Sequence, residues 1–175
     1  MNKRHPRLLP IIQTRKIQVR NSWLQGGWLL SIITIFVSTS VLADTANFGT
    51  ISLSPGSDIL RSSISGYTGG SYSLSAIANR DTNNKACFGF ADPNPDYIVV
   101  LEKDFSNLKL LVNSGGNDTT MLIKAPDNTI YCGDDTGKNK DASIDFKKLK
   151  AGNYKVWVGT FNSNVKQNYT LTVQQ

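Results

Sequence analysis

Residues 153–175 read NYKVWVGTFNSNVKQNYTLTVQQ, and this stretch decides the fold. Apolar or aromatic side chains recur at every second position within each half of it: Tyr154, Val156, Val158, Tyr169, Leu171 and Val173. Because successive side chains of a β-strand point to opposite faces, a period of two predicts two strands, 153–161 and 168–175, that each bury one face.

The same period continues upstream, and no window of 12 residues shows the apolar stripe of a helix. Six further segments are rich in Val, Ile, Thr, Tyr and Phe, as half-buried strands are. These segments are 48–53, 97–102, 108–113, 119–125, 128–133 and 142–146. Turn sequences such as NSGGND (113–118) and APDN (125–128) separate them. Eight or more short strands at this spacing predict an all-β protein, an antiparallel β-sandwich.

Alternation also predicts which side chains share a face. Leu108, Leu110 and Val112 should point one way and Lys109 the other. Further sets that should share a face are Met121 with Ile123, Ile130 with Cys132, Tyr154 with Val156 and Val158, and Tyr169 with Leu171 and Val173. We expect these sets to form one core between two sheets. Residues 55–86 are rich in Gly, Ser and Asn, and they should form loops around one or two short strands.

The N-terminal segment, residues 1–43, predicts a secretory signal peptide. Six basic residues precede residue 44 with no acidic residue among them, and residues 28–43, WLLSIITIFVSTSVLA, are uncharged and largely apolar. The segment ends in Val41-Leu42-Ala43, which places short side chains where a signal peptidase reads the chain. An uncleaved anchor helix is the alternative, but the apolar stretch is shorter than the ~20 residues of a membrane span. We therefore expect cleavage after Ala43, a mature domain of residues 44–175 without a membrane span, and a periplasmic or secreted location.

The charge of the chain divides at the same point. Six of the 19 Lys and Arg residues lie in the signal segment, so residues 44–175 carry 13 basic and 13 acidic side chains. A neutral domain lacks the positive surface that binds phosphate backbones, which argues against nucleic-acid binding. The remaining 132 residues suit a single domain.

Both cysteines, Cys87 and Cys132, lie in the expected mature domain. Two cysteines in an exported chain most simply form one disulfide, and two buried free thiols are the alternative. Closing a loop of this length would stabilise the fold by ~4 kcal/mol on the chain-entropy model.

The C-terminal half resembles the bacterial pre-peptidase C-terminal (PPC) domain. Five motifs carry the resemblance, in order over about 60 residues: Asp118-Thr119-Thr120 before a hydrophobic strand, Pro126-Asp127, Asp134-Asp135, Ala151-Gly152-Asn153-Tyr154 and Tyr169-Thr170-Leu171-Thr172-Val173. The resemblance implies a jelly-roll-like β-sandwich that is not itself catalytic and is usually appended to secreted peptidases. Some relatives bind calcium, and collagenase relatives bind collagen. No catalytic domain is attached here, so a role accessory to a protease would need a separate partner chain.

Catalysis is not expected of the mature domain. The single histidine, His5, lies in the signal segment, which removes histidine-activated nucleophiles and histidine zinc sites. Glu102 is the only glutamate. A pair of aspartates remains as a route to hydrolysis, but most aspartates lie in or beside turn sequences, where they bond nearby backbone N–H groups.

The stretch CGDDTGKNKDASI (132–144) is the candidate metal site. Its oxygen-bearing side chains suit a calcium ion, which takes carboxylate and carbonyl ligands: Asp134, Asp135, Asn139 and Asp141. An EF-hand loop is excluded, because positions six and twelve counted from Asp135 hold Lys140 and Phe146 instead of Gly and Glu.

The simpler interpretation of this stretch is a polar hairpin in which DDTG turns the chain. Lys138 and Lys140 would repel a cation unless they point outward. Asn117 with Asp118 is a second metal candidate, with a cap at the start of a strand as its alternative.

Aromatic residues mark the candidate ligand-binding surface. Trp157 alternates out of phase with Val156 and Val158, so it should lie on the opposite face from that core set. It would form either a surface platform for a sugar ring or a packing contact under residues 55–86. Tyr67 and Tyr72 flank TGGS on an expected loop, and loops on rigid scaffolds often carry binding, although loop tyrosines also pack locally.

These features predict a non-catalytic exported β-sandwich that binds an extracellular or periplasmic protein or polysaccharide, or acts as an accessory domain. The first alternative is a structural or assembly role, in which an edge strand such as NYTLTVQQ (168–175) pairs with another chain. An aspartate-based hydrolase is the second and less favoured alternative.

Overall fold

The computed structural model describes residues 45–56, 63–136 and 138–175, and the predicted signal segment lies outside this part. Apart from a single 3-10 turn, η1 (Leu74–Ala76), all regular elements in it are strands. They are β1 (Thr50–Leu53), β2 (Ser63–Tyr67), β3 (Tyr72–Ser73), β4 (Phe90–Ala91), β5 (Tyr97–Leu101), β6 (Phe105–Asn113), β7 (Thr119–Lys124), β8 (Ile130–Thr136), β9 (Asn139–Leu149), β10 (Gly152–Thr160) and β11 (Asn168–Gln174). The all-β prediction is confirmed.

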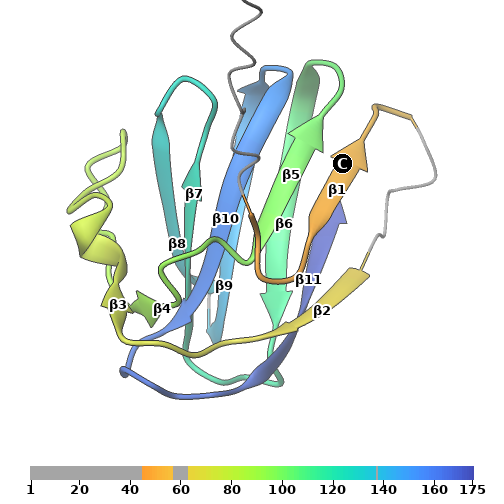
Figure 1. Ribbon diagram of the computed structural model, residues 1–175. Coiled ribbons are helices and arrows are strands. Elements are labelled where there is room, and N and C mark those ends of the chain that lie inside the picture. The colour runs from red at the N-terminus through yellow and green to blue at the C-terminus, as the bar shows by residue number, and fades with distance from the viewer. Residues whose placement is uncertain (1–44, 57–62, 137) are drawn as a thin grey trace, which may run out of the picture. The chain divides into compact units, whose positions relative to one another are not determined.

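The strands form two layers that share β8 (Figure 1). Sheet A has the order β1-β5-β10-β7-β8, with the short strands β3 and β4 attached to β10, and sheet B has the order β8-β9-β6-β11-β2. Residues 130–133 of β8 pair with β7, and residues 134–136 pair with β9. The chain therefore passes from one sheet to the other within β8.

One strand pair departs from the antiparallel prediction. β1 runs parallel to β5 in the register Thr50↔Ile98 to Leu53↔Leu101, whereas the other strand pairs are antiparallel. Parallel neighbours need a long crossover, and residues 54–96 connect these two strands. The sandwich is thus mixed at the β1 edge of sheet A.

The main core lies between the sheets and contains most of the predicted inward-facing side chains. Leu108, Leu110 and Val112 are buried there, and Lys109 is only partly buried. The sets from β7, β10 and β11 join them: Met121, Ile123, Tyr154, Val156, Val158, Tyr169, Leu171 and Val173. Burying such side chains stabilises the fold by ~1.5–3 kcal/mol each before conformational entropy is counted.

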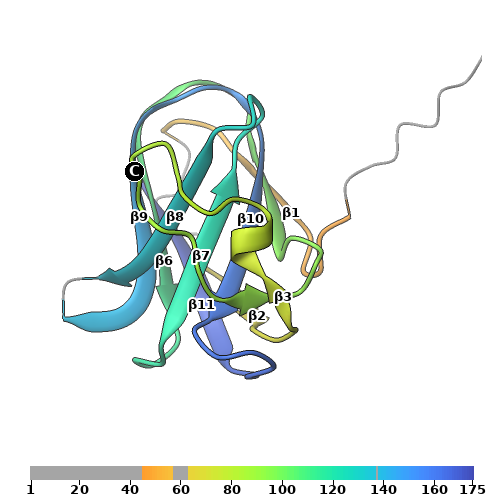
Figure 2. The ribbon, with the colours of Figure 1, turned by 90° about the vertical axis from the view of Figure 1, so that its left-hand side faces the viewer.

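A second apolar cluster lies on the other side of sheet A, and it corrects the prediction of a single core. It contains Leu74, Cys87, Ala91, Leu122, Cys132 and Trp157, with Ile77 and Ile130 packed against it. Residues 72–91 cover sheet A on this side (Figure 2). Ile130 and Cys132 do share a face as predicted, but this face is the outer one.

Sheet A ends at β1 and sheet B ends at β2, and the C-terminal strand is not an edge. β11 pairs with β6 on one side and with β2 on the other. The prediction that residues 168–175 form an edge strand is therefore wrong, because β11 lies between β6 and β2. Within the described residues no helix is long and apolar enough to cross a membrane.

Candidate functional site

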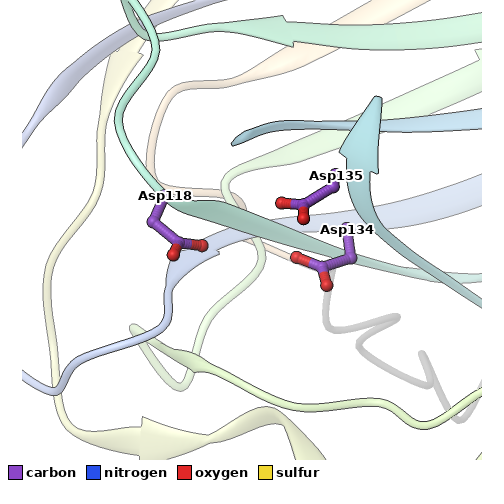
Figure 3. Close-up of side chains that lie close together, drawn as sticks. All are labelled: Asp118, Asp134 and Asp135. Carbon is purple, nitrogen blue, oxygen red and sulfur yellow. The ribbon is translucent and has the colours of Figure 1, made fainter. Parts of the chain in front are cut away.

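The acidic residues predicted as one calcium site divide into two groups. Asp134 and Asp135 lie in β8, which continues through Thr136, so they belong to a strand and not to a turn. Their carboxylates meet that of Asp118, which precedes β7, and one oxygen from each lies within 4.8 Å of the others (Figure 3). Burial raises the pKa of Asp134, and the neighbouring charges of Asp135 and Asp118 add to the increase.

The remaining two predicted ligands are held elsewhere. Asp141 is buried, and its carboxylate accepts hydrogen bonds from the Ser114 N–H at 2.8 Å, from the Ser114 hydroxyl and from the Asn139 amide at 3.0 Å. These bonds fix the 113–118 turn onto β9. The structure thus separates the four predicted ligands, and it places Asp118, from the second predicted metal candidate, beside Asp134 and Asp135.

The three clustered carboxylates fit a calcium ion, since calcium binds through six to eight oxygen atoms and carboxylates are its commonest charged ligands. The Lys140 ammonium lies 3.3 Å from Asp118 and competes for the same negative charge. Asp118, Asp134 and Asp135 are the residues that would hold the ion.

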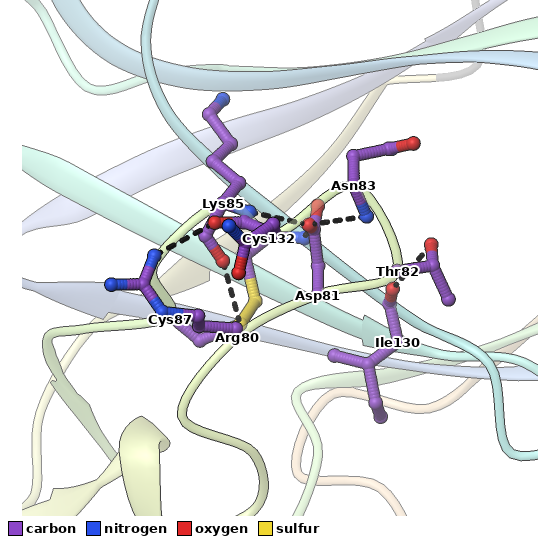
Figure 4. Close-up of a disulfide and its surroundings, with 9 residues drawn as sticks. Arg80, Asp81, Thr82, Asn83, Lys85, Cys87, Ile130 and Cys132 are labelled. Atoms are coloured by element: carbon purple, nitrogen blue, oxygen red, sulfur yellow. Dashed lines mark hydrogen bonds between the residues drawn. A yellow bond between two sulfur atoms is a disulfide. The ribbon is translucent and has the colours of Figure 1, made fainter.

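The predicted disulfide between Cys87 and Cys132 is confirmed, with Cα atoms 5.3 Å apart. It joins β8 to the loop 79–87, in which Asp81 accepts hydrogen bonds from the N–H groups of Asn83 and Lys85, each at 2.8 Å (Figure 4). The second Asp81 oxygen accepts from the Cys132 N–H at 3.4 Å. The disulfide and these hydrogen bonds thus attach the loop to β8, beside the second apolar cluster, which we call the outer cluster.

Trp157 belongs to this covered layer. Its side chain is 6% exposed, and its indole N–H donates to the Pro93 carbonyl at 3.3 Å. The expectation that Trp157 belongs to a ligand-binding surface is wrong, because the 72–91 segment packs over its ring. Trp157 instead packs beneath the upstream segment, which was the other predicted position.

The outer face of sheet B differs, because polar side chains there remain accessible. The cross-strand register aligns them in rows across β6, β11 and β2: Asn168 with Tyr67, Asn113 with Thr170 and Ser65, and Leu111 with Thr172 and Ser63. Most members are exposed or partly exposed hydroxyl and amide residues. Side chains directly opposite each other in a sheet lie about 5 Å apart, so this face presents a continuous set of hydrogen-bonding groups.

A groove of about 470 Å³ lies at the β2 end of this face. We call it the Tyr67 groove; its lining residues are Phe48, Ser65, Gly66, Tyr67, Asn113, Asn168, Tyr169 and Thr170. The Tyr67 side chain is 47% exposed and is therefore the large aromatic surface of the groove. None of the lining residues carries a charged side chain.

Two neighbours orient the Tyr67 ring. Phe48, just before β1, packs against it edge to face with ring centroids 4.9 Å apart. The Lys166 ammonium lies 4.0 Å from the centroid of the Tyr67 ring, in cation–π geometry. The ring is thereby fixed between the edge of sheet A and the loop before β11.

A buried polar group lies beneath the groove. The Asp96 carboxylate is buried and accepts a hydrogen bond from the Val158 N–H at 2.7 Å. Burial raises the pKa of Asp96 to about 7, with a smaller contribution from the charge of Asp92. The hydroxyls of Tyr97 and Tyr169 are buried close to Asp96 and to each other, and burial raises the pKa values of both tyrosines.

The two predicted tyrosines do not share a site. Tyr67 ends β2 in sheet B, and Tyr72 begins β3, which pairs with β4 beside sheet A. Asn113, Asn168 and Lys166 lie beside Tyr67 and were not among the predicted site residues. Period-two alternation could have placed Asn168 on the outward face of its strand, but not beside Tyr67, because that depends on the pairing of β2 with β11.

Comparisons with known proteins found a similarity among solved structures. No protein-family model matches the chain, and no curated protein matches it. Among solved structures, the pre-peptidase C-terminal domain of a collagenase from Bacillus anthracis is similar, with a TM-score of 0.43 and 16% sequence identity over 71% of this chain and 94% of that one. It comes from the family that residues 118–173 resemble in sequence.

Proposed function

We propose that residues 44–175 form a non-catalytic exported domain that binds polysaccharide through the Tyr67 groove, either alone or as an accessory to a separate enzyme. The observation that carries the proposal is the combination of a half-exposed tyrosine ring with amide and hydroxyl side chains in one groove. Sugar rings present apolar C–H faces and many hydroxyls. An aromatic surface bordered by hydrogen-bonding groups complements both.

The rest of the chain supports this proposal. The disulfide suits an oxidising compartment outside the cytoplasm. The only histidine, His5, lies in the predicted signal segment, so the groove has no histidine to act as a general base. The groove also lies on the outer face of sheet B, where the described residues leave it open to a long polymer.

The test is saturable binding of the purified, non-reduced protein to a panel of polysaccharides, measured by calorimetry or by retention in affinity gels. Tyr67→Ala should weaken binding about tenfold, as truncation of a central interface tyrosine often does. Tyr72→Ala is the matched control, because Tyr72 is also an exposed tyrosine but lies beside sheet A. Equal affinities in the two variants would place the site elsewhere, and no binding by the wild-type protein would refute the proposal.

A further inference from the structure

We propose that the Tyr67 groove selects acidic polysaccharides, and that Lys166 is the residue that determines this selectivity. The inference rests on the proposed function, and it names the chemical class of the ligand. A polyuronate is the simplest member of that class, because each sugar ring carries one carboxylate.

The charge distribution is the first support for this inference. The lining residues of the groove are uncharged, so the nearby Lys166 ammonium, 4.0 Å from the Tyr67 ring centroid, sets the sign of the local field. Asp96, which contacts the lining residue Tyr169, is buried, and its raised pKa favours the neutral form below about 7. A negative ligand therefore meets a complementary charge at the groove.

The backbone around Lys166 is the second support, because it fixes the residue beside Tyr67. The Thr68 hydroxyl donates to the Val165 carbonyl at 2.9 Å and accepts from the Gln167 N–H at 3.0 Å. The Thr68 N–H donates to the Gln167 carbonyl at 2.9 Å. Buried Thr68 thus bonds to both neighbours of Lys166 and holds the backbone of the lysine in place. The Lys166 side chain itself is exposed.

Selectivity follows from what happens to the ammonium when a sugar stacks on Tyr67. A sugar that stacks on the ring face covered by the ammonium moves Lys166 away and breaks a cation–π contact worth about two- to fivefold in affinity. A neutral sugar offers the displaced ammonium nothing in return. An acidic sugar offers its carboxylate, which forms a charge-assisted hydrogen bond with the ammonium.

The experiment compares one polyuronate with the same polymer after its carboxylates have been reduced to primary alcohols. The non-reduced wild-type protein should bind the acidic polymer at least fivefold more tightly, and raising the salt concentration from 50 to 500 mM should decrease this preference. Lys166→Met keeps a side chain of similar length without the charge, and it should abolish the preference. Lys109→Met, on the outer face of the same sheet and paired with Asp145, should retain it.

The possible results separate the two proposals. Equal affinity of the wild-type protein for both polymers, or an unchanged preference in Lys166→Met, would overturn the acidic selectivity and leave polysaccharide binding intact. The wild-type protein could bind neither of these two polymers but bind a different, neutral polysaccharide. If Tyr67→Ala weakened that binding, the acidic selectivity would be overturned and the polysaccharide proposal would stand. Failure to bind any polysaccharide would overturn both proposals.

Discussion

Gly66 of β2 lies directly against Tyr169 of β11. A Cβ atom at Gly66 would be 2.7 Å from the ring carbon Cζ and from the hydroxyl of Tyr169. The Tyr97 hydroxyl would also lie 2.7 Å from it. The absence of a side chain at Gly66 therefore allows the edge strand to pack on two buried tyrosines, of which Tyr169 lines the Tyr67 groove.

Replacing Gly66 by Ala should destabilise the protein by about 1–3 kcal/mol, because an added methyl group forces these rings or the strand to move. Urea unfolding measures the change. Gly69→Ala is the matched control, since a Cβ at Gly69 would have no atom within 4 Å. Comparable stability of the two variants would show that β2 does not pack on Tyr169 in this way.

Asp96 should make stability depend on pH. Its pKa in the folded protein is about 7, above the ordinary value of 3.8, so the folded state binds this proton more tightly than the unfolded state does. Its contribution is therefore fully present below about pH 4 and is lost as the pH rises to about 7, a loss of the order of 4 kcal/mol. Hydrogen bonds from the Val158 N–H, Tyr169 and Asn47 lower the pKa of Asp96, and the charge of Asp92 raises it.

Asp96→Asn tests this dependence, because the amide oxygen still accepts from the Val158 N–H but does not titrate. The free energy of unfolding of the variant, measured in urea at several pH values from 4 to 8, should change less with pH than that of the wild type. The stability of the variant relative to that of the wild type should be highest at pH 8. Parallel pH profiles of the two proteins would contradict the raised pKa.

Removing the disulfide should lower the stability of the protein and loosen the attachment of the 79–87 loop to β8. A double replacement of Cys87 and Cys132 by Ala should lower the free energy of unfolding by about 4 kcal/mol on the chain-entropy model, which corresponds to a Tm lower by roughly 10–20 °C. Hydrogen exchange at the backbone N–H of position 87, which donates to the Asn79 carbonyl in the wild type, should also become faster. An unchanged Tm would mean that the bond does not form in solution.

Calcium should raise the Tm if the carboxylates of Asp118, Asp134 and Asp135 hold an ion. Free calcium at 100 times its dissociation constant adds about 2.7 kcal/mol, or several degrees for a domain of this size. Asp134→Asn should abolish the shift, and Asp145→Asn, at an exposed aspartate of β9, should retain it. A Tm that is the same in EDTA and in millimolar calcium would assign these residues a purely structural role.

Much of the fold could be predicted because strand geometry is local. The pleat turns successive side chains to opposite faces, so the spacing of Tyr154, Val156 and Val158 was sufficient to place them in the core. The disulfide could also be predicted, since the expected mature domain contains two cysteines and export favours their oxidation.

The order of the strands depended on contacts that local sequence does not encode. The same alternation in residues 168–175 suits an edge strand or an interior strand, and only the pairing of β11 with both β6 and β2 decides between them. Likewise, alternation placed Trp157 outside the main core, but residues 72–91 decide that its ring is buried.

The amino-acid sequence by itself determined the all-β class, the alternation of side chains along the main strands and the pair of cysteines available for a disulfide, because these follow from the pleat of the backbone and from the residues themselves. Only the tertiary structure brought Asp118 to Asp134 and Asp135, and Tyr67 to Asn168 and Lys166. The reason is physical: a site forms where strands far apart in the chain become neighbours, and the pairing of those strands is set by the packing of the whole core.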